Sequence, residues 1–213
     1  VKAIGSKEKP IIFKKHENAK NWGTIAIHGP QTEGSLFKNI IIENGSGDTI
    51  NGINYNSSLS VHLAKNIKFE HILLKNNSLF DDMLHIIYSD NIQILDTNFV
   101  NAYRDAIDVD ISNNILFKNV NIINSGNDGI DLMESEAKLK QVNISFSGDK
   151  GVSVGENSYV IIEDSVIHSN NFGVVSKDLS RAIIKNSILE NNKIQLSAYK
   201  KNWRYGGSGS IYM

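Results

Sequence analysis

Short apolar runs separated by polar turns fill most of the chain. In the stretch RDAIDVDISNN, residues 104–114, alternation places Ile107, Val109 and Ile111 on one face, and the intervening aspartates with Ala106 on the other. No window keeps the i, i+3, i+4, i+7 spacing of an amphipathic helix. The pattern therefore predicts many short β-strands and no helices.

The strands belong to a repeat. Corresponding lines begin at Asp82, Asp105, Asp128, Lys150 and Phe172, which are 23, 23, 22 and 22 residues apart. Lines this short leave no room for a helix after each strand, which a TIM barrel or doubly wound sheet requires, and a propeller blade needs about forty residues. The chain is therefore predicted to be all-β, a single-stranded right-handed parallel β-helix (solenoid) with coils of about 22 residues.

A second column of side chains supports the same repeat. Its members carry an amide or a carboxylate and are 23, 22, 23 and 22 residues apart: Asp96, Asn119, Gln141, Asp164 and Asn186. Side chains stacked in this way are expected to hydrogen-bond to one another along the solenoid.

The repeat also predicts the domain organisation. We expect one β-helix domain over residues 1–213, with looser N-terminal coils in 1–80 and regular coils in 81–200. Because both ends read as strands already under way, the chain is expected to be a segment of a longer protein.

Composition narrows the range of partners. The chain has no cysteine, which excludes a disulfide scaffold and a thiolate zinc site. Its formal charge of −1 gives no general attraction to nucleic acid or to an anionic membrane, and no apolar run is long enough to span a bilayer.

Acidic side chains gather in two columns on consecutive coils. The turn column comprises Asp82, Asp105 and Asp128, and the outward column comprises His85, Asp108 and Asp131. Carboxylates stacked at the strand spacing of about 4.8 Å repel one another by roughly 1 kcal/mol in water and more when desolvated. Bound Ca²⁺ would offset this repulsion. The predicted calcium ligands are Asp82, Asp105, Asp108, Asp128 and Asp131. The alternative for the turn column is that its carboxylates cap backbone N–H groups.

At this point a family resemblance is evident. The stretches DDMLHIIYSDN, DAIDVDIS, NDGIDL and GDKGVSVGENS resemble repeats of the right-handed parallel β-helix proteins of the pectate-lyase-like superfamily. The same block is similar to β-helix regions found with spore-coat-H-like kinase domains in bacterial surface proteins. The resemblance implies a secreted or cell-surface location in a bacterium. It leaves the function open, because β-helices host lyases, hydrolases, epimerases, adhesins and inert spacers.

One hypothesis is an enzyme that binds or processes acidic polysaccharide, with Lys150, Asp108, Asp131 and His85 as candidate catalytic residues. Acids able to hold Ca²⁺, with a lysine one coil away, resemble the arrangement of some β-helix lyases, in which a lysine removes the α-proton of a uronate. A hydrolase using Asp108 and Asp131 is less consistent with the sequence, because the NTD, GHG and RIK motifs of polygalacturonase-like enzymes are missing.

The alternative is a non-catalytic β-helix module of a larger surface protein, acting as a glycan-binding unit, an adhesin or a rigid spacer. In this interpretation Lys150 is a counter-ion to Asp128, and His85 is a solvated surface histidine. Outward-facing acids within strands favour the enzyme, whereas the short loops after residue 81 favour the module.

Overall fold

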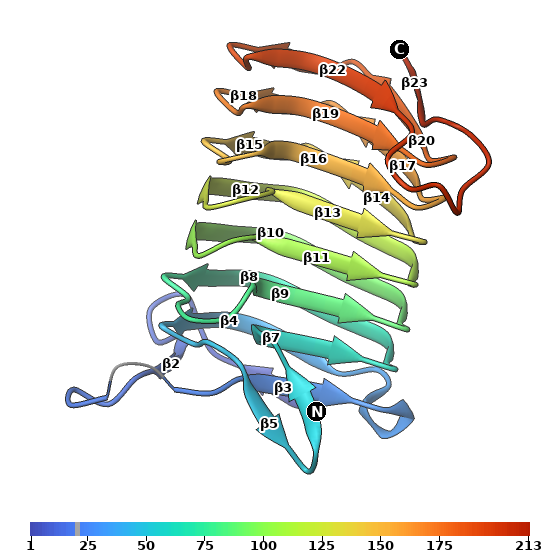
Figure 1. Cartoon of the computed structure of the whole chain (residues 1–213). Coiled ribbons are helices and arrows are strands. Elements are labelled where there is room, and N and C mark those ends of the chain that lie inside the picture. The colour runs from blue at the N-terminus through green and yellow to red at the C-terminus, as the bar shows by residue number, and fades with distance from the viewer. Residues whose placement is uncertain (20–21) are drawn as a thin grey trace.

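The computed structural model describes residues 1–19 and 22–213. The chain winds through two long sheets, so that successive coils stack along one axis (Figure 1). Strands from successive coils pair in parallel throughout both sheets, and the antiparallel pair that the structure describes is the hairpin of β5 (Asp48–Ile50) and β6 (Ile53–Tyr55). The predicted parallel β-helix is confirmed.

The eight-stranded sheet, called here the small sheet, carries the acidic columns. Its strands in spatial order are β3 (Ile25–His28), β7 (Ser57–His62), β9 (Asp82–Ile87), β11 (Ile107–Asp110), β13 (Ile130–Met133), β16 (Lys150–Gly155), β19 (Phe172–Lys177) and β22 (Ile194–Tyr199).

The thirteen-stranded sheet, called the large sheet, closes each coil. Its main path is β1 (Lys2–Ile4), β4 (Leu36–Glu43), β8 (Lys65–Lys75), β10 (Asp90–Ala102), β12 (Asn113–Ser125), β14 (Glu136–Lys140), β17 (Tyr159–Glu163), β20 (Arg181–Lys185) and β23 (Ser210–Tyr212). Beside this path lie β2 (Ile11–Lys14), β15 (Asn143–Ser145), β18 (Val166–His168) and β21 (Ile188–Glu190).

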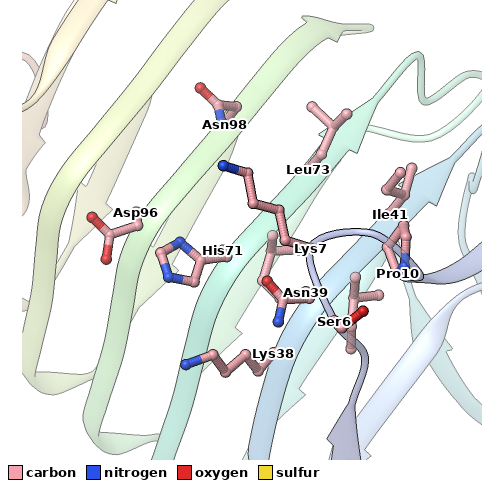
Figure 2. Close-up of a pocket in the computed structure, with 12 residues that line it drawn as sticks. Ser6, Lys7, Pro10, Lys38, Asn39, Ile41, His71, Leu73, Asp96 and Asn98 are labelled. Carbon is pink, nitrogen blue, oxygen red and sulfur yellow. The ribbon is translucent and has the colours of Figure 1, made fainter.

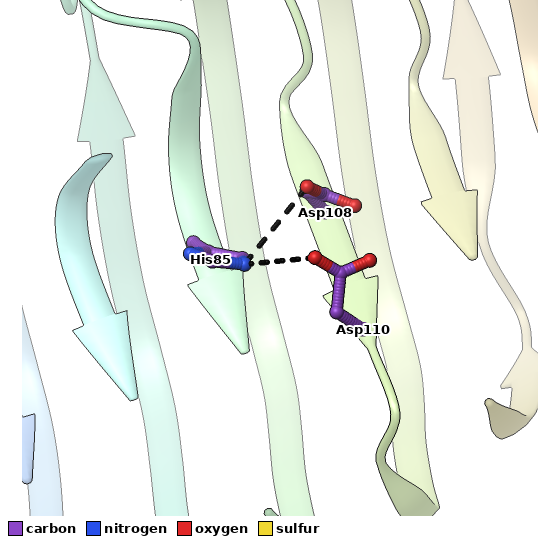
Figure 3. Close-up of side chains that lie close together, drawn as sticks. All are labelled: His85, Asp108 and Asp110. Carbon is purple, nitrogen blue, oxygen red and sulfur yellow. Dashed lines mark hydrogen bonds and ion pairs between the residues drawn. The ribbon is translucent and has the colours of Figure 1, made fainter. Parts of the chain in front are cut away.

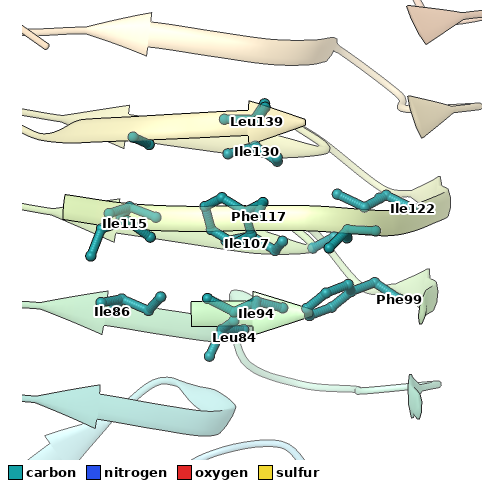
Figure 4. Close-up of a cluster of buried hydrophobic side chains, with 14 of the residues drawn as sticks. Leu84, Ile86, Ile94, Phe99, Ile107, Ile115, Phe117, Ile122, Ile130 and Leu139 are labelled. Carbon is teal, nitrogen blue, oxygen red and sulfur yellow. The ribbon is translucent and has the colours of Figure 1, made fainter. Parts of the chain in front are cut away.

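The core fills the space between the two sheets. Ile107 pairs in register with Leu84 on one side and Ile130 on the other, and all three are buried (Figure 4). Phe117 of β12 reaches the same interior from the large sheet and is fully buried. Because parallel pairing repeats each side chain at the strand spacing, an apolar position in one coil becomes an apolar column.

Two expectations for β11 are wrong. Ile111, predicted to lie in the core, is only half-buried and adopts a left-handed conformation with φ of 43°, because the strand has already ended at Asp110. Ala106, predicted to face outward, lies fully buried in the core cluster, because it precedes the strand, where the alternation does not yet apply.

Left-handed turn residues explain the abundance of asparagine. All five members of the predicted column Asp96, Asn119, Gln141, Asp164 and Asn186 have φ between 48° and 55°. Asparagine and aspartate tolerate this conformation better than other non-glycine residues. Of the predicted ladder, the bond from Asn119 Nδ2 to Asp96 Oδ1 is present. A more continuous ladder runs from Asn124 through Asn101 to Asn76, with both bonds at 2.9 Å.

Buried serines form a further ladder that binds coil to coil. They stack as Ser89, Ser112, Ser135, Ser158 and Ser180, and the backbone N–H of each donates to the Oγ of the next at 3.0–3.1 Å. Each hydroxyl thereby satisfies a buried donor at a turn where the sheet pairing is interrupted.

The helical content of the described residues is the three-residue 3-10 turn η1 (Pro30–Thr32). Nothing helical in residues 1–19 and 22–213 is long and apolar enough to cross a bilayer.

We expect Phe117→Ala to lower the free energy of unfolding by about 3–5 kcal/mol, because the ring is fully buried and its removal leaves a cavity inside the stack. The matched control is Phe146→Ala, whose ring is 57% exposed, and we expect a loss of less than about 1 kcal/mol. Urea unfolding of both variants measures the difference, and equal losses would contradict this placement of the core.

Candidate functional site

The central strands of the small sheet bring the predicted outward column together. Asp108 of β11 pairs in register with His85 of β9 and Asp131 of β13. His85 Nε2 lies 3.3 Å from Asp110 Oδ2 and 4.0 Å from Asp108 Oδ2 (Figure 3). His85 is therefore not the solvated surface histidine of the alternative interpretation, since it is buried and held between two carboxylates.

The turn column is largely engaged by the scaffold. Asp105 Oδ1 accepts hydrogen bonds from the backbone N–H of Asp128 at 2.6 Å and from Asn127 Nδ2 at 2.7 Å. Asp128 Oδ1 accepts the backbone N–H of Lys150 at 2.9 Å. Each carboxylate thus caps the turn of the next coil, which is the structural role that the sequence left open.

Lys150 is bound by two carboxylates. Its Nζ lies 3.3 Å from Asp128 Oδ1 and also forms an ion pair with Asp149. Burial by itself would lower the pKa of this ammonium, but the adjacent Asp128 and Asp149 outweigh it, and the pKa is raised. A lysine held in its protonated form is a counter-ion at neutral pH and lacks the free lone pair that a general base needs.

Three aspartates of this face, Asp82, Asp108 and Asp128, have pKa values well above the ordinary value of a carboxyl group. Burial, followed by repulsion from Asp110 and Asp131, raises the pKa of Asp108 to about 9. Burial and the charge of Asp108 raise the pKa of Asp82 to about 10. Burial and Asp131 raise the pKa of Asp128 to about 7, although Lys150 acts in the opposite direction. Only some of these carboxyl groups are therefore ionised together at neutral pH.

Three aromatic neighbours of the cluster were missed by sequence reasoning. His62 packs edge-on against His85 with ring centroids 5.1 Å apart, and Tyr55 lies 4.8 Å from His62. His28 continues the row and shares a 2.9 Å hydrogen bond with the Tyr55 hydroxyl. Burial, together with the charges of His85 and His28, lowers the pKa of His62 to about 4. At neutral pH, His62 therefore presents an uncharged imidazole beside the acids.

A sequence signal for the row exists in retrospect. The strands within TIAIHG and LSVHLA end at His28 and His62, which are in register with each other, and His62 is in register with Ile87 of the first regular coil. The hairpin of β5 and β6 lies between β4 and β7, and it breaks the regular spacing that identified the later coils.

Two sets of side chains place their ligand atoms within 4.8 Å of one another: His85 with Asp108 and Asp110, and Asp81 with Asp82 and Asp105. Asp131 Oδ1 lies nearby, buried and without a hydrogen-bond partner in the described structure. Carboxylate oxygens are the ligands that Ca²⁺ prefers. Either set could hold a metal ion, and the set of Asp81, Asp82 and Asp105 fits Ca²⁺ because all of its ligand atoms are oxygens.

A hollow of about 710 Å³ lies elsewhere, against the large sheet. It is lined by Ser6, Lys7 and Pro10 of the N-terminal segment and by residues of β4, β8 and β10, including His71 and Asn98 (Figure 2). None of the predicted site residues line it. We place the candidate site on the small sheet because the carboxyl groups with strongly raised pKa values lie there.

Comparison with known proteins agrees with the fold. Residues 82–209 match the family model described as right handed beta helix region, so the chain belongs to that family. Comparison with curated protein sequences gives no match.

Solved structures give the same architecture at low identity. The chain superposes over its full length on 60% of pectate lyase Pel9A, with a TM-score of 0.65 and 11% identity. Over 88% of its length it superposes on 32% of tailspike protein 2 from Escherichia coli O157:H7 bacteriophage CAB120, with a TM-score of 0.52 and 10% identity. The chain therefore spans less than two thirds of either protein.

The raised pKa values predict how stability changes with pH. Unfolded aspartates release their protons near pH 4, whereas Asp108 and Asp82 keep theirs in the folded state up to about pH 9 and 10. The folded state therefore binds more protons between these limits, and its stability falls as pH rises through this window. In chelator, we expect the Tm at pH 8 to lie about 5 °C or more below the Tm at pH 5.

Asp108→Asn removes one of these groups and should raise the Tm at pH 8 while changing it little at pH 5. Asp164→Asn, at an exposed aspartate, is the control and should leave the pH dependence unchanged. Differential scanning calorimetry at both pH values tests this, and a parent protein more stable at pH 8 than at pH 5 would contradict the assigned pKa shifts.

Proposed function

We propose that this chain binds and processes acidic polysaccharide outside the cell, on the outer face of the small sheet. The observation that carries the proposal is the convergence of His85, Asp108, Asp110 and Asp131 on three adjacent strands, where Asp108 has a raised pKa and Asp131 has an unpartnered carboxylate oxygen. Buried acids without a structural partner are costly, and they are typical of sites that bind ions or transfer protons. The similarity of the fold to a pectate lyase and a phage tailspike supports this class of substrate.

The roles of the side chains follow from their environments. A protonated Asp108 can donate to a glycosidic oxygen at neutral pH, because its pKa lies near 9. His85 is the candidate base: when its Nε2–H donates to Asp110 at 3.3 Å, the lone pair stays on Nδ1, which has no partner in the described structure, whereas the ammonium of Lys150 is occupied by Asp128 and Asp149. Calcium, when bound, would neutralise these acids and polarise the carboxyl group of a uronate. Asp81, Asp82 and Asp105 are the residues that would hold it.

A glycan-binding module without catalysis is the second candidate, and the geometry of Lys150 favours it. The lysine expected to act as base is held by two carboxylates. On this alternative the same face binds the polymer but does not cleave it.

Activity on pectate, alginate and glycosaminoglycans, read as absorbance of unsaturated products and as new reducing ends, separates the two candidates. For the enzyme, we expect Asp108→Asn and His85→Asn each to lower kcat/KM by about 10²-fold or more, because each removes a proton-transfer group. Asp164→Asn should retain parent activity. If the protein binds a polymer but turns over none, the glycan-binding module is the remaining candidate. If it shows no binding and no turnover with any of these polymers, the proposal is overturned.

Calcium binding is testable without a substrate. We expect saturating Ca²⁺ at pH 8 to raise the Tm of the chelator-treated protein by several degrees, about 2–4 °C for each kcal/mol of binding free energy. Asp82→Asn should abolish most of this shift, because Asp82 is the most deeply buried member of the trio, whereas the exposed control Asp164→Asn should preserve it. An unchanged Tm would remove calcium from the proposal.

A further inference from the structure

A single long loop departs from the compact turns of the regular coils. Residues 200–209 follow β22 and stand out from the side of the solenoid before the chain returns as β23 (Figure 1). The loop presents Trp203 with 83% of its surface exposed, and Lys200, Lys201 and Arg204 are also exposed. Tryptophan is enriched at binding surfaces, because its ring offers a large apolar face together with a polar N–H group.

The loop is fixed in place at several points. Asp178 Oδ1 accepts the backbone N–H groups of Lys201 at 2.7 Å and Asn202 at 2.8 Å. The Tyr205 hydroxyl donates to Glu134 Oε1 at 2.8 Å. Gly209 packs so closely on the backbone of Ser176 that an added Cβ would lie 2.2 Å from its carbonyl carbon. Trp203 is therefore presented by a built platform rather than by a free tail.

The contact with Glu134 places the platform beside the candidate site. Glu134 directly follows β13, and Asp131 lies three residues earlier on that strand. At about 3.3 Å per residue this is a distance of about 10 Å along the strand. A polymer lying on the small sheet can therefore reach the loop without leaving the face.

The loop carries positive charge, whereas the candidate site is mainly acidic. Residues 194–213 contain three cations, Lys200, Lys201 and Arg204, and no acidic residue. The Arg204 guanidinium lies 6.0 Å from the centre of the Trp203 ring. A flat ring with an adjacent guanidinium matches a sugar that carries a carboxylate, because the ring covers the apolar face of the sugar while the guanidinium forms two bonds to the carboxylate.

We infer that the loop 200–209 is a binding subsite for uronate-containing polysaccharide, in which Trp203 stacks on a sugar ring and Arg204, Lys200 and Lys201 bind carboxylates of the polymer. This inference rests on the proposed function and names the part of the surface that recruits the polymer. It also accounts for how a polyanion approaches a face rich in aspartate: the cations of the loop supply the attraction, and the acids act only on the sugar placed next to it.

Trp203 itself reports on binding, because the chain has only one other tryptophan, Trp22, whose indole N–H is bonded to the Glu43 carbonyl. In a Trp22→Phe background, titration with polygalacturonate or alginate should quench the emission of Trp203 and shift it to shorter wavelength. Uncharged dextran should have no effect. We expect Trp203→Ala to weaken polygalacturonate binding, measured by calorimetry, about tenfold, and Arg204→Ala to do the same.

Tyr212→Ala is the matched control, because Tyr212 is also exposed and lies under an arginine, with Arg181 5.7 Å from its ring, but belongs to β23 and not to the loop. It should bind like the parent. Unchanged emission on saturation with both polymers, or equal binding of a single-stranded oligonucleotide of the same charge, would overturn the subsite. Asp108→Asn separates the two proposals, because it should abolish turnover but leave the quenching of Trp203 by polygalacturonate unchanged. If the parent protein binds polymer through Trp203 but turns over none, the subsite stands and the enzyme is excluded. If the parent turns over polymer and Trp203→Ala changes neither binding nor turnover, the enzyme stands and the subsite is excluded.

Discussion

Every feature of this protein depends on the parallel hydrogen bonding that joins each coil to the next. Because the strands pair in register at a spacing of about 4.8 Å, a residue type in one coil is forced against the equivalent residue of its neighbours. Repetition is favourable for Leu84, Ile107 and Ile130, which form a continuous apolar column. It is also favourable for asparagine and serine, which can donate to one neighbour and accept from the other. For aspartate the same repetition is unfavourable, so each acidic column needs a compensating partner.

The structure supplies that compensation differently in the two columns. In the turn column, Asp105 and Asp128 accept backbone N–H groups from the following coil, and Lys150 adds a positive charge. In the outward column, Asp108 has one ion-pair partner among the described residues, His85 at 4.0 Å, and Asp131 keeps a buried oxygen for which the described structure gives no hydrogen-bond partner. The first arrangement stabilises the scaffold, whereas the second leaves protonation or ligand binding as the remaining ways to satisfy the acids.

The parts that could be predicted from sequence are those that the repeat itself encodes. The spacing of the lines beginning at Asp105 and Asp128 was sufficient for the register that unites Asp108 with Asp131, and its repetition along the chain was sufficient for the fold. The ends of strands were not predictable, because alternation does not say where a strand stops, and Ile111 was misplaced for that reason. His62 was missed because an inserted hairpin breaks the period, and the pairing of Lys150 depends on a side-chain rotamer that spacing does not determine.

The bond between Tyr205 and Glu134 has a consequence for folding kinetics. The side-chain hydrogen bonds that link adjacent regular coils join residues 22 to 26 positions apart, so each closes a short loop as soon as one coil settles on another. Tyr205 and Glu134 are 71 positions apart, and the coils carrying β16, β19 and β22 must be stacked before they can meet. Folding can therefore propagate coil by coil through the solenoid, with closure of this loop as one of its last steps.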